Sequence, residues 1–511
     1  MKARLLYRDR DFDMQAPPPW QAEALTKDLD LTTLFNAMAQ EDDFLREVAA
    51  RVIQTGFEKY PGAIRYRQDI LHDCLNQPAA VRELYALAVE ATEAAKKQYH
   101  GFLFDRYPDS VLRYSIAHME ALVALLKKLR RFTDAQTGRF ASVGWTAFFR
   151  RLTEELTDQY VAGIKEHLEG LKFRGGMLLS AELGSGNKGT RYVLHRPPPG
   201  KRETRWTRFL EWLQEFFPGV AQLFEPEAPP HSFSVHPRDE GGIRALDEVR
   251  NRGIGLAANV LAQSAEQVRG FFGTLRTELA FYIGCLNLHD VLAQKKVPVC
   301  VASPKIMEER RLSFRGLYDV CLALHLDKPV VGNDANADGK ELLLITGANQ
   351  GGKSTLLRAI GLAQLMMQCG MFVPADSFSA SICDGLFTHY KREEDIGMQS
   401  GKLDEELNRM SDIIDQLTPH AMILLNESFA ATNEREGSEI ARQIISALVE
   451  RRIRVICVTH LYELARGFHE SNAGNILFLR APRERTFKLM EGEPLPTSFG
   501  EDLYRNIFGA G

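Results

Sequence analysis

The chain has 511 residues, with 63 basic and 67 acidic side chains that give a formal net charge of −4. Its 45% hydrophobic and 25% charged residues are typical of a globular protein, and this length predicts about two to four domains. The near balance of charge excludes a uniformly basic protein, so any nucleic-acid site has to be local.

The sequence shows no signal for a membrane or an export pathway. No apolar run approaches the roughly 18 residues of a membrane-spanning helix, and Met1-Lys2-Ala3-Arg4 lacks the apolar core of a signal peptide. The seven cysteines contain no C-x-x-C pair, and several lie in apolar runs, as buried reduced thiols do. We therefore expect a cytoplasmic protein without disulfides or a zinc site.

Residues 1–171 have the pattern of helices. Apolar side chains recur at alternating spacings of four and three, which places them on one helical stripe; they are Leu112, Ile116, Met119, Val123 and Leu126. Ordinary core packing and a coiled-coil seam both produce such a stripe, and core packing is the favoured interpretation.

The sequence pattern changes at residue 172 and again at residue 241. Glycine and proline breaks surround the strand-like segments 177–179 and 192–194, which predicts a small inserted domain over residues 172–240. Long helical periodicity then occupies residues 241–299, with a second apolar stripe. Its members are Val268, Phe272, Leu275, Leu279, Tyr282 and Leu286.

From residue 300 to 511 strands and helices alternate. Apolar strand candidates lie at 342–345, 421–425, 453–458 and 476–479. This alternation predicts an α/β domain with a mostly parallel sheet, whose ligand site lies at the carboxyl ends of the strands.

The first of these strands leads into a glycine loop and a helix, with the pattern G-x-x-x-x-G-K-S. Such a loop wraps a phosphate with backbone N–H groups, and the helix N-terminus adds further donors. Lysine can reach the outer phosphates and serine can ligate Mg²⁺. The predicted ATP-binding residues are Gly347, Asn349, Gly351, Gly352, Lys353, Ser354 and Thr355.

Two further strand ends carry candidate catalytic residues. Glu427 follows the strand at 421–425, where a carboxylate can polarise the water that attacks the γ-phosphate. His460 follows the strand at 453–458 and could sense that phosphate, although a purely structural histidine is an open alternative.

Several segments together resemble the ATPase domain of the MutS mismatch-repair proteins. The resemblance covers about residues 330–511, and a more diffuse one covers the helical region before it. The segments are the phosphate loop with Asn349 and the doubled glycine, Gly370–Ala375 (G-x-x-V-P-A), Glu427 with Thr432, Thr459–Leu464 (T-H-x-x-E-L) and Ser498-Phe499-Gly500.

The resemblance implies a multidomain fold. Residues 1–171 and 241–299 would form a mainly α-helical core and lever region, 172–240 a clamp-like insert, and 300–511 a C-terminal α/β P-loop ATPase domain of the ABC type. It also implies ATP and Mg²⁺ as cofactors and a homodimer through the ATPase domains, in which a segment here containing Ser400 and Gly401 completes the partner's site.

The chain departs from the family pattern at residues that would bind the metal and the nucleotide. Asn426 stands where the family has an aspartate, so Mg²⁺ would be held by Ser354 and an uncharged amide, and hydrolysis would be slow. Phe429-Ala430-Ala431 replaces glycines of the family, and Val330 or Val331 replaces an aromatic residue that stacks on adenine.

The mismatch-reading domain of the family is not expected, because the chain begins almost at the core. Phe57-Glu58 resembles its reading pair superficially and is interpreted as part of a helix face.

The inserted segment is the candidate nucleic-acid site. Residues 172–208 contain nine basic and two acidic side chains, which suits a phosphate backbone, and a tryptophan can stack on unpaired bases. The candidates are Lys188, Arg191, Arg196, Lys201, Arg202, Arg205 and Trp206. A solvated basic loop that packs on acidic helices is the competing interpretation.

Two functions remain open from the sequence. The first is a MutS-like ATPase that closes as a nucleotide-switched dimeric clamp on distorted or branched double-stranded DNA. The second is a nucleotide-dependent module that binds RNA or ribosomes with little hydrolysis, an alternative favoured by Asn426 and by the altered trans segment.

Overall fold

The computed structural model describes residues 1–102, 108–172, 178–183, 185, 189–195, 240–392, 401–471, 473–495 and 509. These residues form two compact units. The first contains residues 1–4, 79–141 and 145–279, and the second contains 5–78, 142–144 and 280–511. In the described residues, no helix is long and apolar enough to cross a membrane.

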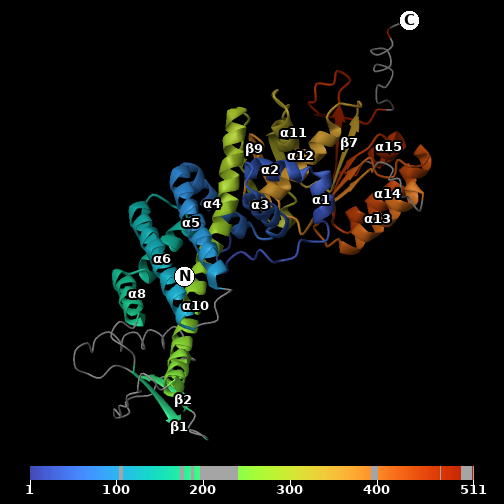
Figure 1. Ribbon diagram of the computed structural model, residues 1–511. Helices are drawn as coiled ribbons and strands as arrows, with labels where there is room; N and C mark the ends of the chain where they lie inside the picture. Colours follow the sequence, from blue (N-terminus) through green and yellow to red (C-terminus); the bar gives the residue numbers. More distant parts are fainter. Residues whose placement is uncertain are drawn as a thin grey trace. The chain divides into compact units, whose positions relative to one another are not determined.

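The first unit is mainly helical (Figure 1). Its helices are α5 (Pro78–Phe102), α6 (Pro108–Gln136), most of α7 (Val143–Glu155), α8 (Asp158–Leu171) and the first part of α10 (Glu240–Gln294). The stripe predicted on α6 is buried throughout. Helix α8 packs on α6, and at its end Lys172 Nζ lies 2.9 Å from Glu120 Oε1. The fully buried ring of Trp145 stacks on Phe149 at 5.5 Å.

The predicted strands of the inserted segment form a hairpin. Strand β1 (Leu178–Leu183) pairs antiparallel with β2 (Gly189–His195). The limits of the predicted clamp-like domain stay a prediction, since residues 196–239 lie outside the described part of the chain.

The second unit begins with four helices near the N-terminus. They are α1 (Ala22–Asp28), α2 (Leu31–Ala39), α3 (Asp43–Thr55) and α4 (Pro61–Asn76). They share a core with the end of α10, where Asn287 Nδ2 donates to the carbonyl of Met38 at 2.9 Å. The buried Arg67 of α4 donates to the carbonyls of Leu6 and Gly56 at 2.8 and 2.6 Å. These bonds tie the N-terminal segment to the rest of the unit.

A six-stranded sheet forms the centre of this unit, in the order β10-β11-β12-β7-β13-β14. The first five strands run parallel and β14 pairs antiparallel with β13. Their bounds are β7 (Leu342–Gly347), β10 (Leu386–Tyr390), β11 (Met422–Asn426), β12 (Arg454–Val458), β13 (Ile476–Ala481) and β14 (Met490–Glu491). The four strands predicted from the sequence, and their parallel arrangement, are confirmed.

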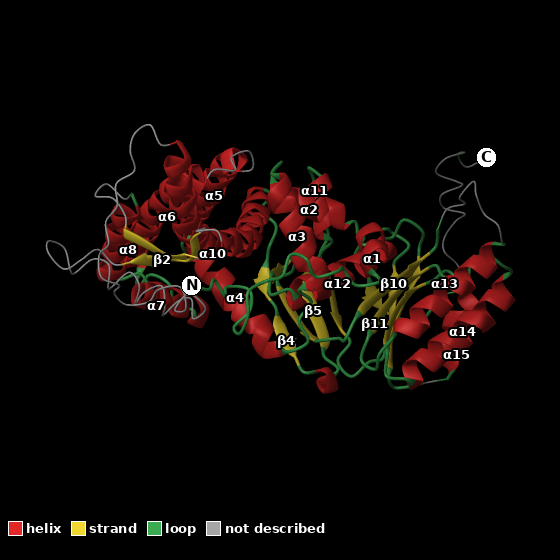
Figure 2. Cartoon of the chain, turned by 60° about the horizontal axis from the view of Figure 1, so that its bottom comes forward, coloured by secondary structure: helices red, strands yellow, loops and turns green. Residues whose placement is uncertain are grey.

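Helices cover both faces of this sheet (Figure 2). On one face lies α12 (Lys353–Gln368), which packs on β7, β11 and β12. On the other face α13 (Lys402–Gln416), α14 (Glu434–Glu450) and α15 (Tyr462–Glu470) bury one apolar cluster that includes Met410, Ile445 and Leu464. This layering brings the carboxyl ends of β7, β11 and β12 to one edge of the sheet, beside the start of α12.

A second, four-stranded sheet lies in the same unit, in the order β4-β9-β5-β6. No continuous apolar run predicts this sheet, although Leu312-Ser313-Phe314-Arg315 alternates between apolar and polar residues as a half-buried strand does. The elements of this region are β3 (Cys300–Val301), β4 (Ser303–Lys305), η3 (Met307–Glu309), β5 (Leu312–Leu317), α11 (Val320–His325), β6 (Asn333–Asn336), β8 (Phe372–Val373) and β9 (Ser377–Ser381).

The structure also tests two smaller predictions. Phe57-Glu58 does not lie on a helix, because α3 ends at Thr55 and α4 begins at Pro61, and Glu58 instead pairs with the buried Arg67 at 2.9 Å. The seven cysteines are free, and all except Cys300 are buried, as predicted.

Candidate functional site

The candidate site begins in the loop between β7 and α12. Gly347 and Gly352 have φ values of +101° and +90°, a region that side chains with a Cβ rarely adopt. A Cβ on Gly347 would also lie 2.4 Å from the carbonyl oxygen of Ala481 in the neighbouring strand. Helix α12 therefore starts directly behind a tight glycine turn, which leaves its first-turn N–H groups facing the loop.

Lys353 lies over the backbone of this loop. Its Nζ donates to the carbonyls of Gly347 and Ala348 at 2.9 and 3.1 Å and contacts Asn349 Oδ1 at 3.4 Å. Burial lowers the pKa of the Lys353 ammonium, and the charge of Glu427 acts in the opposite direction. A buried cation held by uncharged carbonyl oxygens is a favourable partner for a polyanion such as a triphosphate.

The two predicted metal ligands meet in the structure. Ser354 Oγ, in the first turn of α12, donates to Asn426 Oδ1 at 2.9 Å. Asn426 ends β11, so the parallel sheet brings it next to the phosphate loop. Two neutral oxygens at this spacing fit a cation that keeps several waters and takes its remaining ligands from phosphates, as Mg²⁺ does.

The two candidate catalytic residues also lie together. Glu427 Oε1 is 3.9 Å from His460 Nδ1, and both side chains are partly exposed, at 33% and 41%. The Glu427 backbone has φ +54°, and its N–H donates to the carbonyl of Val458 at 2.9 Å. This bond fixes the end of β11 against the end of β12 and directs both side chains to the edge of the sheet that carries the phosphate loop.

The turn after Glu427 contains a residue whose role the sequence did not reveal. Phe429 has φ +63°, although it is aromatic and fully buried. Its N–H donates to Glu406 Oε2 of α13 at 2.8 Å, and its ring stacks on His389 at 5.4 Å. A bulky residue at positive φ is strained by about 1–2 kcal/mol, which packing and this hydrogen bond offset.

His389 joins the same network from the end of β10. Its Nδ1 lies 2.7 Å from Ser428 Oγ and its Nε2 lies 3.1 Å from the carbonyl of Glu406. Burial lowers the pKa of His389 to about 3, and the nearby Arg409 guanidinium adds to this effect. Neutral His389 therefore connects the turn after Glu427 to helix α13.

A second feature that the sequence did not indicate is the loop between β13 and β14. Arg485 Nε donates to the carbonyl of Asn349 at 3.2 Å, which places this loop beside the phosphate loop. Phe487 lies in van der Waals distance of Gly352, since a Cβ there would be 3.5 Å from its Cα.

The structure describes only some of the remaining predicted residues. Thr355 follows Ser354 in the first turn of α12, and Gly401 is the N-cap of α13. Arg191 belongs to β2. Outside the described residues lie Ser400, Lys188, Arg196, Lys201, Arg202, Arg205 and Trp206.

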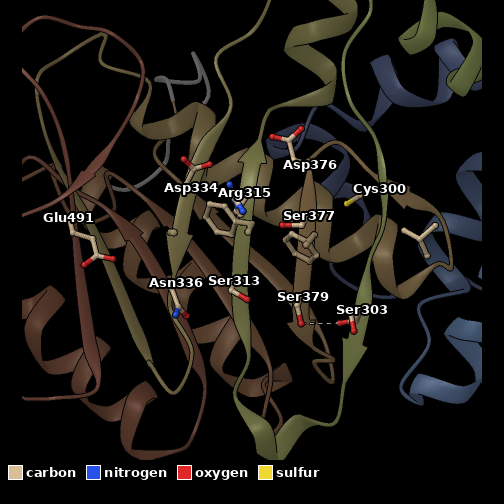
Figure 3. A pocket seen from close by; sticks show the side chains of 14 residues that line it. Cys300, Ser303, Ser313, Arg315, Asp334, Asn336, Asp376, Ser377, Ser379 and Glu491 are labelled. Carbon is tan, nitrogen blue, oxygen red and sulfur yellow. Dashed lines mark hydrogen bonds between the residues drawn. The ribbon is translucent and has the colours of Figure 1, made fainter.

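A groove of about 700 Å³ lies elsewhere in this unit, over the four-stranded sheet (Figure 3). Hydroxyl and amide side chains line it, among them Ser303, Ser313, Ser379 and Asn336. Ser379 Oγ donates to the carbonyl of Ser303 at 3.4 Å. None of residues 347–355 lines the groove, so it is separate from the phosphate loop.

Comparison with known proteins identifies two matching domain families. The MutS2 N-terminal domain matches residues 60–295, and MutS domain V matches residues 343–490. The second match contains the phosphate loop, Asn426, Glu427 and His460.

Individual proteins are similar to parts of the chain. The DNA mismatch repair protein MutS of Chloroflexus aurantiacus is 28% identical over 255 residues, 47% of this chain and 26% of that protein. The Endonuclease MutS2 of Thermus thermophilus is 30% identical over 189 residues, 36% of this chain and 25% of that protein. The MutS protein of Clostridium botulinum is 37% identical over 134 residues, 26% of this chain and 14% of that protein. The alignments thus span about a quarter or less of these relatives.

Proposed function

Because the chain belongs to the MutS-like family, we propose that it is an ATPase that binds double-stranded DNA, distorted or branched, as a nucleotide-switched homodimer. The residues from about 300 onward would be a P-loop ATPase domain of the ABC type, with ATP and Mg²⁺ at the loop Gly347–Thr355. One observation carries the proposal: Ser354 and Asn426 meet at 2.9 Å beside the buried Lys353.

Each residue of the site would have a distinct role in hydrolysis. The backbone N–H groups of the loop and Lys353 bind the phosphates. Ser354 and Asn426 would hold Mg²⁺, which would supply positive charge to neutralise the phosphates. Glu427 orients the attacking water and accepts its proton. His460 lies 3.9 Å from the Glu427 carboxylate, where it can contact the γ-phosphate or support Glu427.

A substitution at Glu427 separates binding from hydrolysis. We expect Glu427→Gln to bind ATP as the wild type does and to lose at least about 100-fold in phosphate release, because general-base assistance is worth 10²–10⁴ in rate. Equilibrium binding of a fluorescent ATP analogue and a steady-state phosphate assay measure the two properties.

The matched control is Glu450→Gln, an exposed carboxylate at the end of α14. It should leave both properties unchanged. Wild-type turnover by Glu427→Gln would remove Glu427 from the mechanism, and failure of the wild-type protein to bind ATP would refute the proposal as a whole.

The nucleic-acid partner is tested with the wild-type protein and with Glu427→Gln. The local excess of basic residues at 172–208 and the DNA mismatch repair relatives support DNA. Anisotropy titrations with a branched duplex, a linear duplex and a structured RNA, with and without ATP, should show tightest binding to branched DNA. Preference for the RNA would instead support an RNA- or ribosome-binding module.

A further inference from the structure

Glu406 is a carboxylate at a core position of helix α13. The buried side chains of this helix are Glu406, Met410 and Ile413, which recur at spacings of four and three on one face. Met410 and Ile413 belong to the apolar cluster that this helix shares with α14 and α15, and Glu406 is only 7% exposed. Burying a carboxylate costs free energy unless it is hydrogen-bonded, so its place in an apolar stripe points to a specific partner.

The partner of this carboxylate is the turn that follows Glu427. Glu406 Oε2 accepts the Phe429 N–H at 2.8 Å. Because Phe429 is fully buried, removal of the carboxylate would leave its N–H without an acceptor in a place closed to water. Burial raises the pKa of Glu406, and the Phe429 hydrogen bond and the charges of Arg409 and Lys391 oppose this rise. The turn and the buried carboxylate therefore stabilise each other.

Two residues of this turn have a backbone that side chains with a Cβ rarely adopt. Glu427 has φ +54° and Phe429 has φ +63°. Such a conformation persists only where the surrounding structure holds it, and it is frequent at functional sites. Before the turn, the Glu427 N–H donates to the carbonyl of Val458 at 2.9 Å. After Glu427, Ser428 Oγ donates to the carbonyl of His389 at 2.8 Å. Hydrogen bonds to β12, β10 and α13 thus fix the backbone on both sides of the Glu427 side chain.

We propose that Glu406 is a positioning residue for ATP hydrolysis, which holds the Glu427 carboxylate where it orients the attacking water. The inference rests on the proposed function and adds to it a residue that acts through Glu427. A general base has to lie within hydrogen-bond reach of the proton that it takes, and a small misplacement of such a group costs much of the rate. The phosphate-binding groups, Lys353 and the loop 347–352, belong to other elements, so ATP binding does not depend on Glu406.

The first test replaces Glu406 in the full chain by a residue that suits the apolar stripe. Glu406→Met removes the acceptor and fits beside Met410, so the free energy of unfolding should stay close to that of the wild type. We expect its kcat for ATP hydrolysis to fall about 10-fold or more, with the affinity for ATP unchanged. Glu406→Gln keeps an oxygen that can accept the Phe429 N–H and should restore most of kcat. Asp412→Ala, which removes an exposed carboxylate of the same helix, is the matched control.

Three measurements on each variant separate these effects. Steady-state phosphate release gives kcat, equilibrium titration with ATP gives the affinity, and urea unfolding gives the stability. Glu406→Ala removes the same acceptor without adding bulk, and it replaces Glu406→Met in the comparison if the methionine variant does not fold.

A double variant shows whether Glu406 acts through Glu427. In Glu427→Gln the general base is already absent, so adding Glu406→Met should lower the residual rate no further. A loss by the same factor in both backgrounds would show that Glu406 supports the domain in general and does not position the base.

Two further results would overturn this inference while the proposed function stands. One is a kcat of Glu406→Met equal to that of the Asp412→Ala control. The other is a loss of kcat that Glu406→Gln does not relieve, because the hydrogen bond to Phe429 would then not be its cause. A wild-type protein that binds no ATP or does not hydrolyse it would refute the proposed function itself and this inference with it.

Discussion

Among single residues, Asn426 has the largest effect on the charge of the proposed metal site. Asn426 Oδ1 accepts a hydrogen bond from Ser354 Oγ at 2.9 Å, so the amide has the geometry of a Mg²⁺ ligand without a negative charge. A carboxylate at this place would add a full charge close to the cation, where such interactions are strong. The proposed metal site therefore has two neutral oxygen ligands and lacks the negative charge that a carboxylate would add.

Restoring the charge should strengthen metal binding. We expect Asn426→Asp to lower the Mg²⁺ concentration that half-saturates nucleotide binding by about 10-fold, which corresponds to about 1.4 kcal/mol. A Mg²⁺ titration at fixed ATP measures this shift. Asn433→Asp is the matched control, because Asn433 is the exposed N-cap of α14 and aspartate caps equally well. An unchanged Mg²⁺ dependence in Asn426→Asp would contradict the assignment of Asn426 as a ligand.

At the scale of elements, helix α13 and strand β10 hold the turn that carries Glu427. Glu406 of α13 accepts the N–H of Phe429, and His389 of β10 bonds Ser428 and stacks on the Phe429 ring. Burial raises the pKa of Glu406, while the hydrogen bond from Phe429 opposes that rise. Helix α13, whose N-cap is Gly401, is thus in direct contact with the turn after Glu427.

This network predicts a pH dependence of stability. The pKa of His389 falls from its ordinary value near 6.5 to about 3 on folding. Between these values the unfolded chain binds the proton and the folded chain does not. The contribution of His389 is therefore complete above about pH 6.5, and the free energy of unfolding decreases as the pH falls toward 3, by at most about 1.4 kcal/mol per pH unit.

A variant isolates this contribution. In His389→Gln the loss of stability between pH 7 and pH 5 should be smaller than in the wild type, as measured by urea unfolding at each pH. His469→Gln is the control, because His469 is 40% exposed, and it should lose stability with the wild-type slope. Identical slopes for wild type and His389→Gln would show that His389 is protonated in the folded protein.

At the scale of the whole molecule, the open question is whether ATP joins two chains. Gly401 lies at the exposed start of α13, next to Ser400, in the segment proposed to complete a partner's site. An interface that contains the nucleotide is stabilised when the nucleotide persists, because a ligand bound across two subunits favours the dimer by mass action.

Light scattering tests this assembly. The Glu427→Gln protein, which should retain ATP, is expected to double its mass when ATP and Mg²⁺ are added, and the wild type should do so transiently or in part. Lys353→Ala, which lacks the phosphate-binding ammonium, is expected to show no ATP effect. A mass that is the same with and without ATP in Glu427→Gln would exclude nucleotide-driven dimerisation.

Much of the second unit could be predicted from the sequence. Short apolar runs ended by polar residues gave the parallel strands, because such strands are buried on both faces. The four-stranded sheet was not predicted, since β5 and β9 mix buried and exposed positions and do not form the continuous apolar runs of β11 and β12. The predicted helix at Phe57-Glu58 is wrong, because Gly56 ends α3 and Pro61 begins α4, and Glu58 between them pairs with Arg67.

The sequence alone predicts the phosphate loop, the strands that end at Asn426, Glu427 and His460, and the MutS-like family of the chain. These features depend on local spacing, which a sequence displays directly. The tertiary structure decided which distant side chains meet. Phe487 reaches Gly352, and Phe429 is held at positive φ by Glu406 and His389, through packing between segments far apart in the chain. No local pattern encodes such contacts, because they depend on how whole elements pack.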